Sequence, residues 1–254
     1  MSFHSEIGII GGSGFYHLNT DKKAEDIDYL DVHTPFSDQA NRLFREKLNN
    51  HCVYFLPRHG VTHSIPPHKI NYRANIWALK ELGVKKILAV NAVGGIAPNL
   101  TPGSLVIPDQ LIDYTWGREH SFFDGLNSLH DHIDFTFPYD NELRNALIDA
   151  AAKLNIEITP QGCFACTQGP RLETAAEIQK LKSDGCSVVG MTGMPEAALA
   201  RELGMAYACI TLVVNPAAGL SDELITIEKI KTVLDAGIQD VRSLLNTSLE
   251  KLQL

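Results

Sequence analysis

Two polar side chains at the ends of apolar segments are the first candidates for binding chemistry. Glu173 lies in the segment Gln-Gly-Pro-Arg-Leu-Glu-Thr, and Asn215 follows the apolar run Thr-Leu-Val-Val. A carboxylate accepts hydrogen bonds, whereas an amide both donates and accepts them. If the two converge on one pocket, they can bind the ring N–H and the carbonyl edge of a 6-oxopurine. We therefore expect this pair to select the base of a purine ligand.

Three further segments, each following an apolar run, are candidates for binding an anion. The turn Gly-Gly-Ser-Gly places the Ser13 hydroxyl among backbone N–H groups that can donate to phosphate, although a plain turn explains the same residues. In Pro-Arg-His-Gly, Arg58 can hold a phosphate through two parallel N–H bonds, and His59 supplies another donor. In Val-Asn-Ala-Val-Gly-Gly, backbone amides at Asn91 and Ala92 can donate at a strand end, and a tight turn is the alternative.

Two other kinds of site fit the sequence less well. His59, His63 and His68 lie within ten residues and could ligate zinc, but two prolines interrupt them, no carboxylate or Cys joins them, and the adjacent arginine repels a cation. Cys163 and Cys166 have C-x-x-C spacing, but their apolar run lacks the strand-to-helix setting that lowers a thiol pKa. The five irregularly spaced cysteines indicate reduced thiols. We predict no metal site.

Composition is that of a globular protein and excludes several function classes. The 254 residues carry a net charge of −8, with 44% hydrophobic and 20% charged residues, and we expect one domain over 1–254. No Lys/Arg cluster supports nucleic-acid binding. No apolar stretch approaches the ~20 residues of a membrane span, and the first residues do not read as a secretory signal. We expect a cytoplasmic protein without a membrane or nucleic-acid partner.

Apolar runs bounded by Gly and Pro alternate with segments of helical period, which is typical of an α/β domain. The pattern predicts strands over 6–10, 52–56, 86–90, 104–107, 162–167, 187–191 and 208–214. It predicts helices over 72–82, 141–154, 174–183, 195–203 and about 226–249. Met191 and Thr192 precede one helix, where they can serve a site or act as core filler and helix cap. The aromatic, irregular stretch 114–139 is predicted to form a subunit interface.

Taken in order, six segments resemble the trimeric purine nucleoside phosphorylase family, and within it the methylthioadenosine phosphorylase branch. They are Gly-Gly-Ser-Gly, Pro-Arg-His-Gly, Asn-Tyr-Arg-Ala-Asn-Ile-Trp-Ala-Leu-Lys, Asn-Ala-Val-Gly-Gly, Gln-Gly-Pro-Arg-Leu-Glu-Thr and Met-Thr-Gly-Met-Pro-Glu-Ala. The resemblance implies a phosphorylase/hydrolase-like fold with a twisted mixed sheet flanked by helices. It also implies a homotrimer with active sites near subunit interfaces, and phosphorolysis of a nucleoside with inorganic phosphate as co-substrate and no cofactor.

The resemblance also assigns roles to individual residues by position. It implies a phosphate site made of Ser13, Arg58, His59, Asn91, Ala92 and Thr192. Met191 would pack on the ribose, and Leu172 falls where family members often place an aromatic against the base. His63 and His132 match a histidine near the sugar and one contributed by the neighbouring subunit. Asn215 and His59 are the expected catalytic residues.

At the base end the sequence departs from the adenine-specific branch. Members of that branch have an aspartate where Asn215 stands, another where Ala217 stands, and a serine in place of Glu173. Asn215 can donate its N–H to N7 and O6, and Glu173 can accept from N1–H but would face the lone pair of adenine N1. A mismatched buried donor or acceptor costs ~1–3 kcal/mol. We therefore expect adenine to be rejected and a 6-oxopurine to be bound.

The 5′ end of the sugar is expected to lie against apolar residues. Relatives that cleave inosine and guanosine present a histidine from the C-terminal helix to the 5′-hydroxyl, but this chain has none after His132. By position, Ile227 and Ile230 occupy the place of small apolar residues in the methylthio-specific branch. A thiomethyl gains ~0.8 kcal/mol per buried methylene equivalent there.

The expected reaction is phosphorolysis of S-methyl-5′-thioinosine to hypoxanthine and 5-methylthioribose 1-phosphate. The alternative is a general 6-oxopurine phosphorylase acting on inosine or guanosine. A methylthioadenosine phosphorylase, a nucleoside hydrolase and a non-catalytic purine-binding protein are further alternatives.

Overall fold

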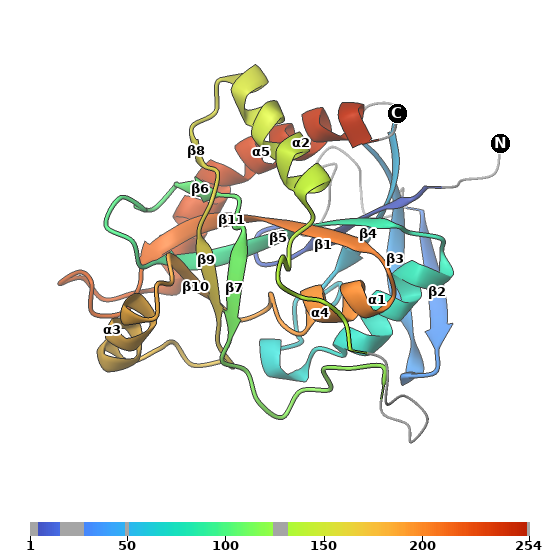
Figure 1. Cartoon of the computed structure of the whole chain (residues 1–254), viewed down its shortest axis with the longest axis horizontal. Helices are drawn as coiled ribbons and strands as arrows, with labels where there is room; N and C mark the ends of the chain where they lie inside the picture. The colour runs from blue at the N-terminus through green and yellow to red at the C-terminus, as the bar shows by residue number, and fades with distance from the viewer. Residues whose placement is uncertain (1–4, 16–27, 49–50, 124–131, 253–254) are drawn as a thin grey trace.

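The computed structural model describes residues 5–15, 28–48, 51–123 and 132–252. Their strands form one twisted mixed sheet with helices on both faces (Figure 1). The strands are β1 Ile7–Gly11, β2 Tyr29–Thr34, β3 Ser37–Leu48, β4 His51–Pro57, β5 Lys86–Gly95, β6 Leu105–Val106, β7 Gln110–Asp113, β8 Ile158–Thr159, β9 Cys163–Cys166, β10 Val188–Gly190 and β11 Ala206–Pro216. The helices are α1 Tyr72–Glu81, α2 Asn141–Leu154, α3 Ala175–Ser183, α4 Glu196–Glu202 and α5 Ile227–Leu252, with a 3₁₀ turn at Pro67–Lys69. The predicted α/β fold with a twisted mixed sheet is confirmed.

Strand β5 is the axis of the sheet. It runs parallel to β1 on one edge and to β11 on the other, and β1 in turn is parallel to β4. At its end, Gly94 and Gly95 pair with β10 in the antiparallel sense. Residues 90–93 therefore lie between the β1 and β10 pairings on one edge, where the strand order changes. Ligands bind at such switch points in open α/β sheets, beyond the carboxyl ends of the strands.

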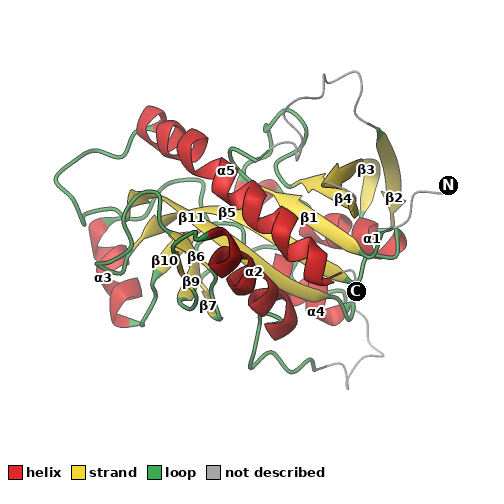
Figure 2. Ribbon diagram, turned by 90° about the horizontal axis from the view of Figure 1, so that it is seen from above, coloured by secondary structure: helices red, strands yellow, loops and turns green. Residues whose placement is uncertain are grey.

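Both faces of the central strands are buried, so their side chains alternate between two cores. In β11, Ile210 and Leu212 join the cluster that contains α2 and α5, whereas Cys209 and Val213 join the cluster that contains α1 and α4. Figure 2 shows α2 and α5 together on one face of the sheet. The apolar stripe predicted for the last helix packs there. No helix of the described residues is long and apolar enough to span a bilayer.

All the predicted strands and helices are present, and capping explains the sharp ends of α2. The Asp140 side chain accepts from the Leu143 N–H at the start, and Asn155 ends the helix in the left-handed conformation with φ 54°. The hairpin of β2 and β3 was not predicted. Its exposed positions carry charges such as the Asp31–Arg42 pair, which hide the apolar alternation.

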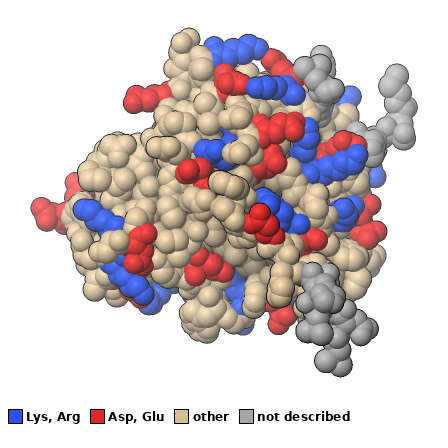
Figure 3. All heavy atoms as spheres, in the orientation of Figure 1, with Lys and Arg blue, Asp and Glu red and all other residues tan. Residues whose placement is uncertain are grey.

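Acidic and basic side chains are interspersed on the face of the molecule in Figure 3. A nucleic-acid backbone would need an extended basic surface, and this mixture does not provide one on that face.

Two residues of α5 provide a matched test of the packing. Leu245 is 0% exposed, whereas Ile227 on the same helix is 80% exposed. We expect Leu245→Ala to lower the free energy of unfolding by about 2–5 kcal/mol, because it leaves a cavity. Ile227→Ala should change it by less than about 0.5 kcal/mol. Urea denaturation of both variants measures this, and equal losses would contradict the placement of α5.

Candidate active site

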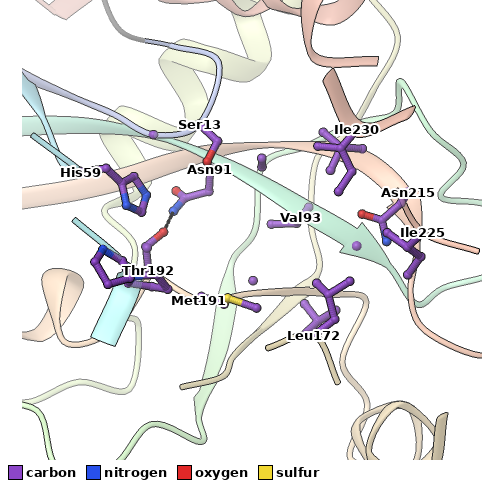
Figure 4. Close-up of a pocket in the computed structure, with 18 of the residues that line it drawn as sticks. Ser13, His59, Asn91, Val93, Leu172, Met191, Thr192, Asn215, Ile225 and Ile230 are labelled. Atoms are coloured by element: carbon purple, nitrogen blue, oxygen red, sulfur yellow. Dashed lines mark hydrogen bonds between the residues drawn. The ribbon is translucent and has the colours of Figure 1, made fainter. Parts of the chain in front are cut away.

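A cavity of about 370 Å³ opens at the switch point. It is bordered by the turns after β1 and β4, the ends of β5, β10 and β11, the loop before α3 and the start of α5. The predicted site residues that line it are Ser13, Arg58, His59, His63, Asn91, Ala92, Leu172, Glu173, Met191, Thr192, Asn215, Ala217 and Ile230. Ser13, His59, Asn91 and Thr192 gather at one end, and Asn215, Leu172, Ile225 and Ile230 at the other (Figure 4).

The glycine-rich turn after β1 lies close to the floor of the cavity. The Phe15 N–H donates to the Gly12 carbonyl over 3.1 Å, and Gly14 has φ +77°, a conformation that favours glycine. A Cβ on Gly12 would lie 2.9 Å from Nη1 of Arg58. The glycines therefore let the backbone approach Arg58 while Ser13 borders the cavity.

Arg58 is bound to Glu196 through one pair of its N–H groups. Its Nε and Nη2 donate to the two carboxylate oxygens of Glu196 over 2.6 and 2.7 Å, and Nη1 donates to the Val90 carbonyl over 3.1 Å. The Tyr207 hydroxyl adds a 2.8 Å bond to the same carboxylate. Glu196 thus takes the N–H groups on the Nε side of the guanidinium, and the role of Arg58 in binding phosphate stays a prediction. Arg58 is among the residues that border the cavity, although its side chain is fully buried.

Burial alone would lower the pKa of Arg58, but the Glu196 carboxylate more than offsets burial and raises that pKa. The guanidinium therefore stays charged, and the ion pair is 0% and 1% exposed. Sequence reasoning missed Glu196, whose partner is 138 residues away. The only available signal was a glutamate in the first turn of a predicted helix, where such residues are ordinary.

Asn91 and Thr192 form a second buried pair at the same end of the cavity. Nδ2 of Asn91 donates to Oγ1 of Thr192 over 2.8 Å (Figure 4). The Thr192 hydroxyl accepts this bond and keeps its own proton for a ligand. The helix-cap alternative for Thr192 is wrong, since α4 begins at Glu196 without a side-chain cap. The tight-turn alternative for the Asn91 segment is also wrong, because that segment belongs to β5.

The His59 ring is neutral at pH 7 and donates away from the cavity. Its Nδ1 lies 2.8 Å from the Ile65 carbonyl, which requires a proton on Nδ1. The pKa of His59 is lowered to about 4, mainly by burial. The Ile65 bond acts against this shift, whereas Arg58 and His63 add to it. Nε2 of the neutral ring is an acceptor, so the prediction that His59 donates to phosphate holds only for the protonated ring. His63 lines the same cavity, with its ring centroid 4.5 Å away.

Asn215 and Glu173 reach the cavity from two different elements. The register of β11 against β5 shifts between Val213 and Asn215, a β-bulge. As a result Val214 and Asn215, neighbours in sequence, both line the cavity. Nδ2 of Asn215 donates to the Pro216 carbonyl over 2.6 Å, which leaves its second N–H and Oδ1 for a ligand. Glu173 comes from the loop before α3, next to the half-exposed Leu172.

At the far end, the structure corrects one of the two predicted isoleucines. Ile230 lines the cavity, but Ile227 is 80% exposed as the first residue of α5 and does not. Ile225, in the segment before the helix, takes its place. Ile225 lies in the loop and Ile227 at the start of the helix, so their side chains point in different directions. Matching by position in the sequence therefore selected Ile227 instead of Ile225.

A second cavity of about 530 Å³ adjoins this end and was not predicted. The two cavities share Val214, Asn215, Ile225 and Ile230. Polar side chains also line the second cavity, among them Glu223, Thr226 and Lys229. Ile225 and Ile230 thus lie between the two cavities.

The stretch 114–139 is described outside 124–131, and Arg118 ties it to the site. This arginine is 8% exposed and donates to the Tyr72 hydroxyl, the Met194 carbonyl, and the Thr167 and Gln168 carbonyls. Sequence reasoning missed this role. The subunit interface stays a prediction for this stretch. His132 is exposed and does not line the cavity within this chain.

The redox and metal alternatives find no support in the geometry. Cys163 and Cys166 both lie in strand β9, and burial raises the pKa of Cys166 to about 12. A thiol with so high a pKa is not an activated nucleophile. In the ranges that the structure describes, no three His, Cys, Asp or Glu side chains cluster as metal ligands.

Comparison with known proteins identifies the family. The sequence profile of the phosphorylase superfamily matches residues 6–250. The chain belongs to the phosphorylase superfamily. The family predicted from the ordered motifs is therefore confirmed, as is the prediction of a nucleoside phosphorylase.

Relatives within the phosphorylase superfamily extend over nearly the whole chain. A probable S-methyl-5′-thioinosine phosphorylase of Pseudomonas syringae pv. tomato is 49% identical, covering 93% of this chain and 95% of the relative. A 6-oxopurine nucleoside phosphorylase of Pyrococcus furiosus is 46% identical, covering 94% and 90%. A methylthioadenosine phosphorylase from Schistosoma mansoni in complex with adenine has a similar structure, with a TM-score of 0.89 and 34% identity over 98% of this chain and 92% of that one.

The buried ion pair gives the first test of the site in this phosphorylase-superfamily protein. Glu196→Gln leaves the Arg58 charge buried without its partner, so we expect a loss of about 3–5 kcal/mol in the free energy of unfolding. The control is Glu250→Gln, which removes the exposed Lys153–Glu250 pair and should leave the free energy of unfolding nearly unchanged. Urea denaturation compares the two, and equal small losses would show that the buried pair is not essential.

The lowered pKa of His59 predicts how stability depends on pH. Between pH 6.5 and about 4 the unfolded histidine binds a proton that the folded ring does not, so folding stability falls as the pH falls through this window. We expect this residue to account for up to about 3 kcal/mol of the loss. His59→Gln should flatten the curve of unfolding free energy against pH in that window. Parallel curves for the two proteins would contradict the assignment.

Proposed function

We propose that this protein catalyses phosphorolysis of S-methyl-5′-thioinosine to hypoxanthine and 5-methylthioribose 1-phosphate. The observation that carries the proposal is one cavity with anion-binding groups at one end and an amide, a carboxylate and apolar side chains at the other. Met191 and Val93 lie between the two ends, where they can pack on a sugar.

At the anion end, the donors to phosphate are the Ser13 and Thr192 hydroxyls and the backbone near Ala92, with the buried Arg58 charge beside them. Because the charge of Arg58 is balanced by Glu196, these groups orient phosphate without fully neutralising it. A phosphate that keeps its negative charge can attack C1′ and stabilise the cationic ribosyl transition state. His59 Nε2 is placed to accept a hydrogen bond from a protonated phosphate oxygen.

At the base end, Glu173 accepts from N1–H, and the free N–H of Asn215 donates to N7 or O6. Negative charge flows into the purine as the glycosidic bond breaks. The Asn215 bond strengthens as that charge grows, which is the differential stabilisation that catalysis needs. Adenine offers a lone pair at N1 and an amine at C6, so the same two residues oppose it.

At the 5′ end, Val214, Ile225 and Ile230 form an apolar wall. A thiomethyl group gains from burial against this wall, whereas a hydroxyl there would lose its hydrogen bonds. The relative from Pseudomonas syringae, named as a probable S-methyl-5′-thioinosine phosphorylase, supports this substrate for the present chain.

The second candidate is a general 6-oxopurine nucleoside phosphorylase. It is favoured by the second cavity behind Ile225 and Ile230, where Thr226 or a water held there could meet a 5′-hydroxyl. The relative from Pyrococcus furiosus carries that name.

We infer further that the enzyme works as a homotrimer in the cytoplasm, without a metal or cofactor. The exposed Trp116 and Phe137, both in the stretch 114–139, support a covering subunit there. In such an assembly His132 would be offered to the neighbouring site rather than to its own.

Base release from S-methyl-5′-thioinosine, inosine and S-methyl-5′-thioadenosine, with and without phosphate, tests the proposal. We expect kcat/KM for S-methyl-5′-thioinosine to exceed the value for inosine by about 10-fold or more, from the burial of the thiomethyl and the unsatisfied hydroxyl. Cleavage of S-methyl-5′-thioadenosine should be weaker still.

Comparable rates on inosine would establish the second candidate instead. Preferred cleavage of S-methyl-5′-thioadenosine would refute the roles of Glu173 and Asn215. Turnover without phosphate would indicate a hydrolase, and hypoxanthine binding without turnover would indicate a purine-binding protein.

A further inference from the structure

We propose that Thr167 is a positioning residue that fixes the Glu173 carboxylate as an acceptor and thereby sets the preference for 6-oxopurines. This inference rests on the proposed function, which gives Glu173 its role at the base. Its basis is a hydrogen bond of 2.6 Å from Oγ1 of Thr167 to Oε1 of Glu173. Thr167 does not line the cavity, so it acts through Glu173.

The Thr167 hydroxyl sits on a rigid part of the fold. Thr167 follows β9, and its N–H donates to the Gly190 carbonyl at the end of β10 over 2.8 Å. Its carbonyl accepts from the buried Arg118 over 3.3 Å. The backbone of Thr167 is therefore held by a second strand and by an arginine from the stretch 114–139.

The hydroxyl has one proton and two acceptors within reach. The Gly190 carbonyl lies 3.3 Å from Oγ1, whereas the Glu173 carboxylate oxygen lies 2.6 Å away. Hydrogen bonds to a charged acceptor are shorter and stronger than those to a neutral carbonyl. The proton is thus given to Glu173.

Glu173 depends on this bond because, among the residues that the structure describes, no other donor is hydrogen-bonded to its carboxylate. The residue lies in the irregular segment between β9 and α3 and is half-buried. Arg171, the nearby cation, instead bonds both carboxylate oxygens of Glu177 over 2.8 and 2.9 Å. The following residue, Thr174, fixes only the backbone, since its side chain caps α3 in a capping box with Glu177.

A carboxylate held in this way presents a defined face to the purine. Oε1 receives the Thr167 proton, so Oε2 is left to accept the ring N–H of a 6-oxopurine. A carboxylate that accepts in this way cannot donate to the N1 lone pair of adenine. Thr167 therefore strengthens binding of one class of purine and opposes the other.

Thr167→Val keeps the shape of the side chain and removes the hydroxyl, and Thr167→Ser keeps the hydroxyl. We expect Thr167→Val to raise KM for S-methyl-5′-thioinosine and the inhibition constant of hypoxanthine by about 10- to 100-fold, the range for a lost bond to a charged group. KM for phosphate should stay unchanged. The ratio of kcat/KM for S-methyl-5′-thioinosine over S-methyl-5′-thioadenosine should fall. Thr167→Ser should keep both this ratio and KM for S-methyl-5′-thioinosine close to the wild-type values.

Thr211→Val is the matched control, because this buried threonine donates to the Val106 carbonyl and does not line the cavity. It should lower stability without changing the ratio between the two substrates. In a Glu173→Gln background, Thr167→Val should have little further effect on that ratio, since the two residues act through one carboxylate. If Thr167→Val does not fold, Thr167→Ala is measured with the same readings.

An unchanged KM and substrate ratio in Thr167→Val, with wild-type turnover of 6-oxopurine nucleosides, would overturn the role of Thr167 and leave the proposed function standing. Additive effects of Thr167→Val and Glu173→Gln would also overturn it. Failure of the wild-type protein to cleave any 6-oxopurine nucleoside would instead refute the proposed function itself.

Discussion

The buried ion pair between Arg58 and Glu196 is the constraint on which the site is built. It joins the end of β4 to the start of α4, and it recruits the Tyr207 hydroxyl from β11 and the Val90 carbonyl from β5. Two charges removed from water are tolerated only when their hydrogen-bonding groups are satisfied. That requirement holds β4, β5, β11 and α4 together around the ion pair. The glycine-rich turn after β1 can then approach only because Gly12 has no Cβ to meet the guanidinium.

This arrangement changes the electrostatics that a basic motif implies. A guanidinium already neutralised by Glu196 contributes little net charge to the cavity, and His59 is neutral because burial and its charged neighbours lower its pKa to about 4. The donors that remain in the cavity are the Ser13 and Thr192 hydroxyls and backbone N–H groups. In the proposed reaction, phosphate is thus oriented by dipoles that were fixed during folding, and its own charge stays available for the ribosyl cation.

The sequence predicted the elements whose signals are local. Asp140 and Asn155 mark both ends of α2, and apolar runs mark the buried strands. It also predicted which turns meet at the cavity, since the carboxyl ends of parallel strands share one edge. It could not predict relations between distant residues. The segment Pro-Arg-His-Gly gives no sign that Glu196, far along the chain, binds the Arg58 guanidinium. Ile227 and Ile225 differ by two positions, but only the start of α5 decides which one faces the cavity.

The base end shows why residue types alone do not define specificity. Asn215 faces the cavity because a bulge in β11 breaks the alternation of the strand, and one of its N–H groups is already used by the Pro216 carbonyl. Glu173 stands on a loop, where a carboxylate without a hydrogen-bond donor could rotate. Both side chains therefore need support from groups that never touch the ligand. A relative with the same pair but different support would share the residues of the site and differ in how sharply it separates one purine from another.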